Sequence, residues 1–313
     1  MGGSTSDNVI DSRRGAQPTP LRIEAIWTGP AVLGECPLWD DRLQRLYWID
    51  SCQRRIWRSD AEGGDLRSWQ VPDTIGSIGL CGDHRLIAGL SGGFAFIELD
   101  DPEPDIQWIG NPEPDSPGTR LNDGKVDRQG RFWCGSMNRG FSTPNASLYR
   151  LDPDLRWRPM DDGFTVSNGI AFSPDGTALY FSDSRVDRSY RYDLDPETGE
   201  ISNRRPFVDT GAYLGRIDGA TVDEDGNYWG ALFEGGAVAC FSPDGELMRS
   251  IRLPVACPTM CAFGGADLDI LFVTSATFAM SEAQIAAEPQ AGALFAVEGL
   301  GVRGVAEPRF ASP

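Results

Sequence analysis

A short pattern, a polar turn followed by a strand, recurs six times along this chain of 313 residues. In each copy an aromatic or aliphatic run follows the turn and ends in a small or acidic residue. The turns begin at Asp41, Gly82, Gln129, Asp175, Asp225 and Ala266, which are 41 to 50 residues apart. Four-stranded propeller blades have this period, so the sequence predicts an all-β, six-bladed β-propeller. Two stacked β-sandwiches, the competing all-β architecture, do not predict such a repeat.

The repeat sets the expected domain organisation. Residues 1–20 are rich in Gly, Ser, Asp and Pro without apolar periodicity, so we expect a disordered leader there. The propeller is expected to occupy residues 21–313 as a single domain. Only a short stretch around Ser281 to Ala287 suggests a helical turn. The tryptophans at repeat positions are expected in the blade cores: Trp39, Trp48, Trp133 and Trp229.

Charge restricts the function. The 28 Lys and Arg residues against 46 Asp and Glu give a formal net charge of −18. Nucleic acids and anionic membranes both need a basic face, so neither is an expected partner. No run approaches the roughly 18 apolar residues of a spanning helix, and the N-terminus lacks the pattern of a secretory signal. The sequence therefore predicts a soluble, cytoplasmic protein; it leaves the oligomeric state open.

Cysteine and histidine usage excludes several chemistries. The seven cysteines are scattered without a CxxC pair, which predicts reduced core residues rather than disulfides or a zinc ribbon. His84 is the only histidine, so a site built on several imidazoles is impossible. A catalytic dyad or triad would have to use His84, which lies in a polar stretch typical of a solvated turn. We therefore expect no nucleophilic serine or cysteine.

One position of the repeat carries polar side chains. Equivalent inner-strand positions of different blades converge on the axis of a propeller. Counting seven residues back from the turns at Arg42, Gln129, Asp175 and Asp225 gives Glu35, Asn122, Asn168 and Asp218. The looser turns of the second and sixth blades give Gly76 or Ser77 and Thr259 or Met260.

This constellation predicts an axial metal site. Two anions and two amides directed at one point would repel each other or stay unsatisfied without something between them. Carboxylate and carboxamide oxygens are hard donors, which suit Ca²⁺, Mg²⁺ or Mn²⁺. Alternatively, Asn168 and Asp218 cap the loops of their strands, as Asn and Asp do in turns.

Several segments also resemble a known family. They are GECPLW at 34–39, TRLNDGKVDRQGRFWCGSM at 119–137, SNGIAFSPDG at 167–176, DGATVDEDGNYW at 218–229 and AGALFAV at 291–297. Together they are similar to the regucalcin-like senescence marker protein/gluconolactonase family, over about residues 22–310. The segment NDGKVD is the most specific of these. The resemblance implies a six-bladed propeller that hydrolyses sugar lactones with a metal ion.

The resemblance also implies roles for individual residues. The metal ligands of the family match Glu35, Asn168 and Asp218, and its substrate-contacting residues match Arg120 and Asn122. We expect one divalent ion, with Ca²⁺, Mg²⁺, Mn²⁺, Zn²⁺ and Fe²⁺ all open. An ion held by three protein groups keeps positions free for a carbonyl and a water. Asp218 is the candidate catalytic residue because its second oxygen can steer or deprotonate that water.

The chain departs from the family after the segment GSM. Acidic residues that bind sugar hydroxyls are often found there, whereas this chain has Asn138, Arg139, Gly140 and Phe141. Arg216 lies two residues before Asp218, so it is expected on the same strand face. With Arg120, the guanidinium groups of Arg139 and Arg216 predict a carboxylate-bearing lactone as substrate, beside the neutral aldonolactones implied by the family.

Two other functions remain open at this stage. One is an aryl-ester or phosphotriester hydrolase, because related metal propellers use a similar carboxylate and amide site. The other is a propeller that binds calcium without catalysis. Arg120 and Asn122 favour catalysis over the non-catalytic propeller, since a purely structural ion needs no positive charge beside it.

Overall fold

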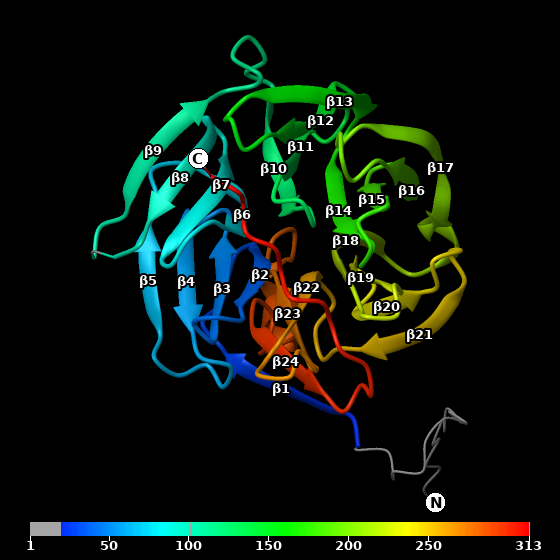
Figure 1. Cartoon of the computed structure of the whole chain (residues 1–313). Helices are drawn as coiled ribbons and strands as arrows, with labels where there is room; N and C mark the ends of the chain where they lie inside the picture. Colours follow the sequence, from blue (N-terminus) through cyan, green and yellow to red (C-terminus); the bar gives the residue numbers. More distant parts are fainter. Residues whose placement is uncertain (1–19, 101, 313) are drawn as a thin grey trace, which may run out of the picture.

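The computed structural model describes residues 20–100 and 102–312. In this part of the chain, 24 strands form six four-stranded antiparallel sheets, which surround a central axis as blades (Figure 1). The predicted six-bladed β-propeller is therefore confirmed. Of the expected leader, residues 1–19 lie outside the described residues.

The blades follow one another along the chain, each running from the axis outward. Blade 1 consists of β2 (Gly34–Asp40), β3 (Arg45–Asp50), β4 (Arg55–Ser59) and β5 (Arg67–Gln70). Blade 2 consists of β6 (Ile75–Leu80), β7 (Arg85–Leu90), β8 (Gly93–Glu98) and β9 (Asp105–Gly110). Blade 3 consists of β10 (Thr119–Val126), β11 (Phe132–Asn138), β12 (Ala146–Leu151) and β13 (Trp157–Phe164).

The second half of the ring repeats this order. Blade 4 consists of β14 (Ser167–Phe172), β15 (Ala178–Asp183), β16 (Arg188–Leu194) and β17 (Ile201–Asp209). The short 3-10 helix η1 (Thr210–Ala212) follows β17 in the chain. Blade 5 consists of β18 (Arg216–Val222), β19 (Tyr228–Phe233), β20 (Ala237–Phe241) and β21 (Leu247–Arg252). Blade 6 consists of β22 (Pro258–Gly264), β23 (Ile270–Ser275), β24 (Leu294–Glu298) and β1 (Arg22–Trp27).

Blade 6 closes the ring. Its outermost strand is β1, which comes from the beginning of the described chain and pairs antiparallel with β24 (Figure 1). This pairing joins the first and last strands, so the ring cannot open without breaking a strand ladder. Helix α1 (Glu282–Ala287) lies between β23 and β24 and starts with a capping box at Ser281, where the sequence suggested a helical turn.

The recurring turns join the first and second strands of the blades. Asp127 and Asp223 lie two residues before the turn residues Gln129 and Asp225. The Oδ1 atom of each accepts hydrogen bonds from two turn amides, and the Oδ2 atom accepts one from the indole of Trp133 or Trp229 at 2.9 Å. The repeat thus specifies both the turn and the anchoring of a core side chain. All four tryptophans expected in the blade cores are buried.

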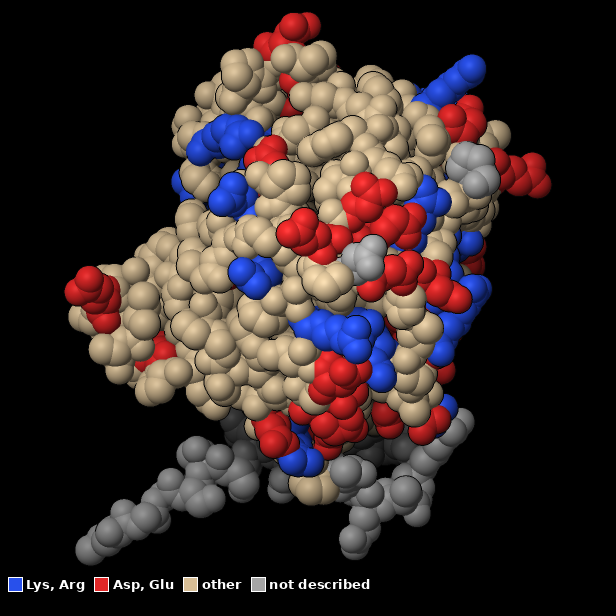
Figure 2. Space-filling view, turned by 90° about the vertical axis from the view of Figure 1, so that its left-hand side faces the viewer, with Lys and Arg blue, Asp and Glu red and all other residues tan. Residues whose placement is uncertain are grey.

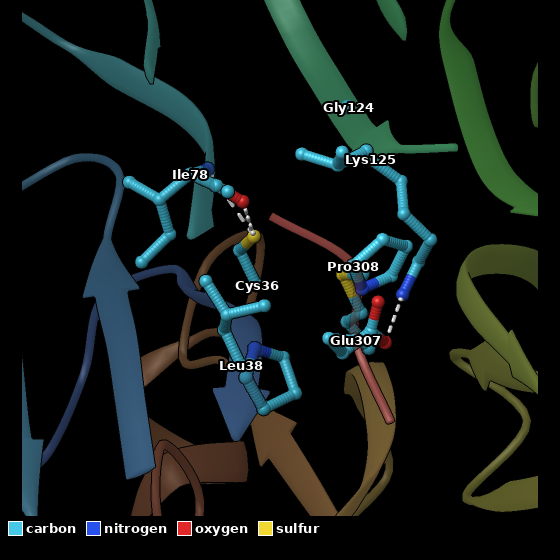
Figure 3. A pocket seen from close by; sticks show the side chains of 11 residues that line it. Cys36, Leu38, Ile78, Gly124, Lys125, Glu307 and Pro308 are labelled. Carbon is cyan, nitrogen blue, oxygen red and sulfur yellow. Dashed lines mark hydrogen bonds and ion pairs between the residues drawn. The ribbon is translucent and has the colours of Figure 1, made fainter. Parts of the chain in front are cut away.

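A C-terminal strap, residues 300–312, crosses the face that carries these turns (Figure 1). Its backbone pairs with several blades: the amides of Phe310 and Ala311 donate to the carbonyls of Leu80 and Gly130 at 2.7 and 2.9 Å. Beneath the strap, the ammonium group of Lys125 donates to Glu307 at 2.7 Å (Figure 3). The cavity left there measures about 10 Å³, room for one water molecule. The strap therefore closes one end of the axial channel.

The outer surface carries both signs of charge. Acidic and basic side chains lie intermixed on the side of the propeller (Figure 2). Among the described residues, no helix is long and apolar enough to cross a membrane.

Candidate active site at the channel axis

A β-bulge in each innermost strand shapes the end of the channel opposite the strap. All six strands shift register against their neighbour close to their first residues. A bulge bends the strand and re-aims its side chains, so that alternation between two faces is locally lost. Glu35, Asn168 and Asp218 lie at or within three of these bulges. Cys36, which follows Glu35, and Gly169, which follows Asn168, have left-handed φ angles of 50° and 60°.

Glu35 and Asp218 form a pair of partly buried carboxyl groups near the start of their inner strands. Burial, followed by the charges of Asp218 and Asp123, raises the pKa of Glu35 well above its usual range. Burial and the charge of Asp123 raise the pKa of Asp218 to about 8. In the described chain neither carboxylate forms a salt bridge, and no residue donates a hydrogen bond to the side chain of Asp218. Without a cation between them, these groups favour the protonated form.

A chain of hydrogen bonds fixes the amides beside this pair. Arg120 donates to Asn122 Oδ1 at 2.9 Å, and Asn122 Nδ2 donates to Asn168 Oδ1 at 3.0 Å. Asn168 Nδ2 in turn donates to Ser184 Oγ at 2.9 Å. These bonds orient both carboxamides, and they leave Asn168 Oδ1 a second lone pair for another partner. The structure thus brings Arg120, Asn122 and Asn168 together at one end of adjacent strands.

Asp123 is a third carboxyl group at the axis, and the sequence analysis missed it. It is buried, and its Oδ2 accepts a hydrogen bond from the amide of Ile170 at 2.9 Å. Burial raises the pKa of Asp123 to about 6, although the amides of Ile170, Gly124 and Gly169 and the charge of Lys125 oppose this shift. Because backbone amides engage this carboxylate, it ties β10 to β14 and adds negative charge below Glu35 and Asp218.

The two further arginines expected at the site have different surroundings. Arg139 donates from Nε to the carbonyl of Thr119 at 3.0 Å. Because Thr119 directly precedes Arg120, this bond holds Arg139 near Arg120, and burial and the like charge of Arg139 lower the pKa of Arg120 to about 10. Arg216 instead forms an ion pair with Glu234. Among the described residues, neither Arg120 nor Arg139 forms a salt bridge, whereas Arg216 is already neutralised.

Blades 2 and 6 contribute no charge at the shared position. The hydroxyl of Ser77 contacts the thiol of Cys134 at 3.6 Å. Thr259 donates to the carbonyl of Gly34 and hydrogen-bonds with the hydroxyl of Thr274 at 2.9 Å. These hydroxyls are used inside the ring, so polar chemistry at the axis rests on blades 1, 3, 4 and 5.

The donor set fits a divalent cation. Two carboxylates and one carboxamide supply hard oxygen atoms, the kind that calcium, magnesium and manganese prefer. Among the described residues, no group of three or more His, Cys, Asp and Glu side chains is placed to hold a metal ion. A site at the axis therefore depends on Asn168 as the third protein donor beside Glu35 and Asp218. A cation there would balance the two carboxylate charges that burial leaves unpaired.

Most of the cysteines lie in the core, and the lone histidine lies in a turn, as the sequence predicted. All seven cysteines are free, and five are buried, but Cys52 is exposed on the turn after β3. His84 lies in the turn between β6 and β7, at the end of blade 2 that the strap covers, with a φ of 63°.

We expect His84→Asn to leave kcat within about threefold of the parent, because His84 lies at the end of the channel opposite the axial carboxylates. Loss of a general base would instead lower kcat about a hundredfold or more. Asparagine tolerates the left-handed backbone at this position. Steady-state hydrolysis rates of parent and variant test this. A loss on the order of a thousandfold, as for a missing triad member, would revive nucleophilic catalysis.

Comparisons with known proteins agree with this geometry. Residues 33–277 match the model of the SMP-30/gluconolactonase/LRE-like region. A 6-deoxy-6-sulfogluconolactonase of Pseudomonas putida is 39% identical over 92% of this chain and 98% of its own. An L-arabinolactonase of Azospirillum brasilense is 36% identical over 90% of this chain and 92% of its own.

A solved structure supports the same assignment. The calcium-binding protein regucalcin of Agrobacterium tumefaciens superposes with a TM-score of 0.87 and 28% identity, covering 91% of this chain and 96% of that chain. The family match, the lactonase relatives and the shared propeller all cover most of the chain. The chain therefore belongs to the SMP-30/gluconolactonase/LRE-like family, whose relatives named here include lactonases of sugars.

Proposed function

We propose that the protein hydrolyses a sugar lactone to the open-chain hydroxy acid with one divalent metal ion held by Glu35, Asn168 and Asp218. The observation that carries this proposal is the pair of partly buried carboxyl groups of Glu35 and Asp218, which have no salt-bridge partner in the described chain, beside an oriented carboxamide. The lactonase names of two relatives support the reaction, and the calcium-binding regucalcin supports a divalent ion. Free cysteines fit a reducing compartment such as the cytoplasm.

The residues of the chain divide the chemistry among them. When bound, the divalent ion supplies a Lewis acid for the lactone carbonyl. Asp218 accepts a proton from the attacking water, whose oxygen forms a bond to the carbonyl carbon. The ring C–O bond breaks, the ring oxygen takes up that proton as a hydroxyl, and the new carboxylic acid ionises. Each turnover therefore releases one proton to solvent at neutral pH.

Arg120 and Asn122 position the substrate in this scheme. Arg120 keeps guanidinium N–H groups beyond its bonds to Asn122 and the carbonyl of Leu121. Those groups can donate to ring oxygens or to an anionic substituent above the axial site. This arrangement favours catalysis over a purely structural calcium site.

A panel assay tests the function. The protein is freed of metal, reloaded with Ca²⁺, Mg²⁺, Mn²⁺, Zn²⁺ or Fe²⁺ and mixed with aldonolactones, an aryl ester and a phosphotriester, while acid release is followed. We expect turnover of lactones that depends on an added ion. Preferred hydrolysis of the aryl ester or the phosphotriester, or tight calcium binding without turnover of any of these compounds, would overturn the proposal.

We also propose that the preferred lactone carries an anionic substituent, a carboxylate or a sulfonate. Arg120 and Arg139 lie close enough for one to lower the pKa of the other, and neither forms a salt bridge among the described residues. An anion between two such guanidinium groups would relieve their repulsion and form charge-assisted hydrogen bonds. The name of the Pseudomonas putida relative includes a sulfo group, which agrees with an anionic substrate.

Arg139→Gln tests the charge of the substrate. A charge-assisted hydrogen bond contributes about 1.5 to 3 kcal/mol, so we expect kcat/KM for an anionic lactone to fall about tenfold to a hundredfold. The value for a matched neutral lactone should change little. Separate carboxylate and sulfonate lactones identify which anion is preferred.

Arg216→Gln is the matched comparison, because Glu234 already neutralises this arginine. It should affect anionic lactones less than Arg139→Gln does. A parent enzyme that strongly prefers the neutral lactone, with no change in Arg139→Gln, would refute the anionic substrate.

A further inference from the structure

Two phenylalanines meet above the axial site. Phe141 belongs to the loop between β11 and β12 in blade 3, and Phe278 to the loop between β23 and α1 in blade 6. Their ring centroids are 6.4 Å apart and their planes are inclined by 42°. Both side chains are large and apolar, yet 38% and 36% of their surfaces are exposed. Each ring is therefore partly exposed at the surface and contacts the other across the two loops.

The contact spans the mouth of the channel. Inner strands contact each other in the ring order β2, β6, β10, β14, β18 and β22, so blades 3 and 6 face each other across the axis (Figure 1). Loops that follow the second strand of a blade lie at the end of the channel where Glu35 and Asp218 are, opposite the strap. Two loops from facing blades can touch at this end only by reaching over the opening between them.

Both loops are tied to the strands that carry the site. The amide of Phe278 donates to the carbonyl of Val32 at 2.8 Å, three residues before Glu35. Arg139, two residues before Phe141, donates to the carbonyl of Thr119, the neighbour of Arg120. The two rings are therefore held at fixed places relative to the metal-binding and substrate-binding residues proposed above.

The backbone presents Phe141 at a conformational cost. Its φ is 56°, a left-handed value that is unfavourable for a bulky side chain. Asn138 stabilises this conformation: its carbonyl accepts from the amide of Phe141 at 3.0 Å, and its Oδ1 accepts from Gly140 and Ser142 at 3.0 and 3.3 Å. Strain of this kind persists where the surroundings fix it and is frequent at ligand-binding sites.

We propose that Phe141 and Phe278 form an aromatic bar across the mouth that restricts the protein to lactones with a single sugar ring. This inference rests on the proposed lactonase function. The proposal places a single ring beside the axial carboxylates, on the inner side of the bar. A second sugar ring attached to the first would extend outward from the axis toward the two phenylalanines, whose ring centroids are only 6.4 Å apart.

The experiment compares glucono-1,5-lactone with cellobionolactone, its two-ring counterpart, in the parent, Phe141→Ala and Phe278→Ala. The parent should prefer the single-ring lactone strongly in kcat/KM. A wall of a binding site contributes about tenfold to a hundredfold to discrimination. Each variant should therefore raise kcat/KM for the two-ring lactone at least tenfold, while the single-ring value changes much less.

Leu214→Ala is the control, because Leu214 is an apolar residue that is 75% exposed in a loop of the same face. It should leave the preference unchanged. Equal use of both lactones by the parent, or an unchanged preference in both phenylalanine variants, would overturn the proposal that Phe141 and Phe278 exclude two-ring lactones.

A second measurement does not depend on turnover. Melting temperatures of Phe141→Ala, Phe278→Ala and the double variant form a cycle, in which a real contact makes the two losses non-additive. Additive losses would overturn the contact itself. If the cycle shows coupling but no lactone is hydrolysed by any variant, the lactonase function fails and the selectivity drawn from it is overturned, while the contact stands.

Discussion

Asp218→Asn is expected to lower kcat by on the order of a thousandfold or more while the protein stays folded. The substitution removes a proposed metal ligand and the proposed proton acceptor together, and a metal ion contributes several kcal/mol of transition-state stabilisation, each 1.36 kcal/mol being tenfold in rate. Steady-state acid release in the presence of saturating metal measures the loss. Asp225→Asn is the matched control, since Asp225 is exposed in the turn at the opposite end of the same blade.

The same variant should change stability with opposite signs in the two metal states. In the metal-free protein the partly buried Asp218 and Glu35 carboxyl groups lie close enough to repel each other, and Asp123 adds a third negative charge. A neutral amide relieves that repulsion, so metal-free Asp218→Asn should melt at or above the temperature of the metal-free parent. Added metal should stabilise the parent far more than the variant. Full activity of Asp218→Asn, or equal stabilisation by metal, would remove Asp218 from the site.

The repeat explains why so much of the fold could be predicted. Each turn with its following strand is a local signal, and the second strand of every blade begins where the repeat expected it, from β3 to β23. Shared register also predicted that Glu35, Asn168 and Asp218 would lie at one level, and the structure places all three near the start of their inner strands. Counting works here because every blade has the same hydrogen-bonded frame.

Features that depend on bulges or on non-local contacts could not be predicted in this way. Asp123 follows Asn122 directly, so strict alternation in a strand sends it away from the axis. The bulge between Leu121 and Gly124 removes that alternation, and both side chains then lie at the centre.

Other features arise between segments that are far apart in the sequence. The pairing of Arg216 with Glu234 joins β18 to the turn after β19. The strap joins the C-terminal residues to four turns, and Phe141 meets Phe278 across the ring. No repeat position encodes any of these contacts. A bulge itself leaves little signal beyond residues that tolerate a left-handed backbone, such as Gly169.

Metal affinity should rise steeply with pH, and chelation should abolish activity. Burial raises the pKa of Asp218 to about 8 in the metal-free protein, above the ordinary 3.8 of an aspartate. At pH 6 the folded, metal-free protein therefore keeps a proton that the unfolded chain has lost, and an incoming cation must displace it. Metal binding then strengthens about tenfold per pH unit for each carboxyl group that loses a proton, and it levels off above pH 8.

The stability of the metal-free protein should change with pH in the opposite direction from its metal affinity. A carboxyl group whose pKa is raised by folding stabilises the protonated fold, so the stability of the metal-free protein should fall as pH rises from about 4 to 8. Calorimetric titration with Mn²⁺ at pH 6 and pH 8 should show a difference in affinity of about fiftyfold or more, and Asp218→Asn should lose most of it. Thermal melts of the metal-free protein over the same range give the opposite slope. An affinity for metal that is independent of pH would contradict a site in which Glu35 and Asp218 are the charged ligands, because their protons compete directly with the cation.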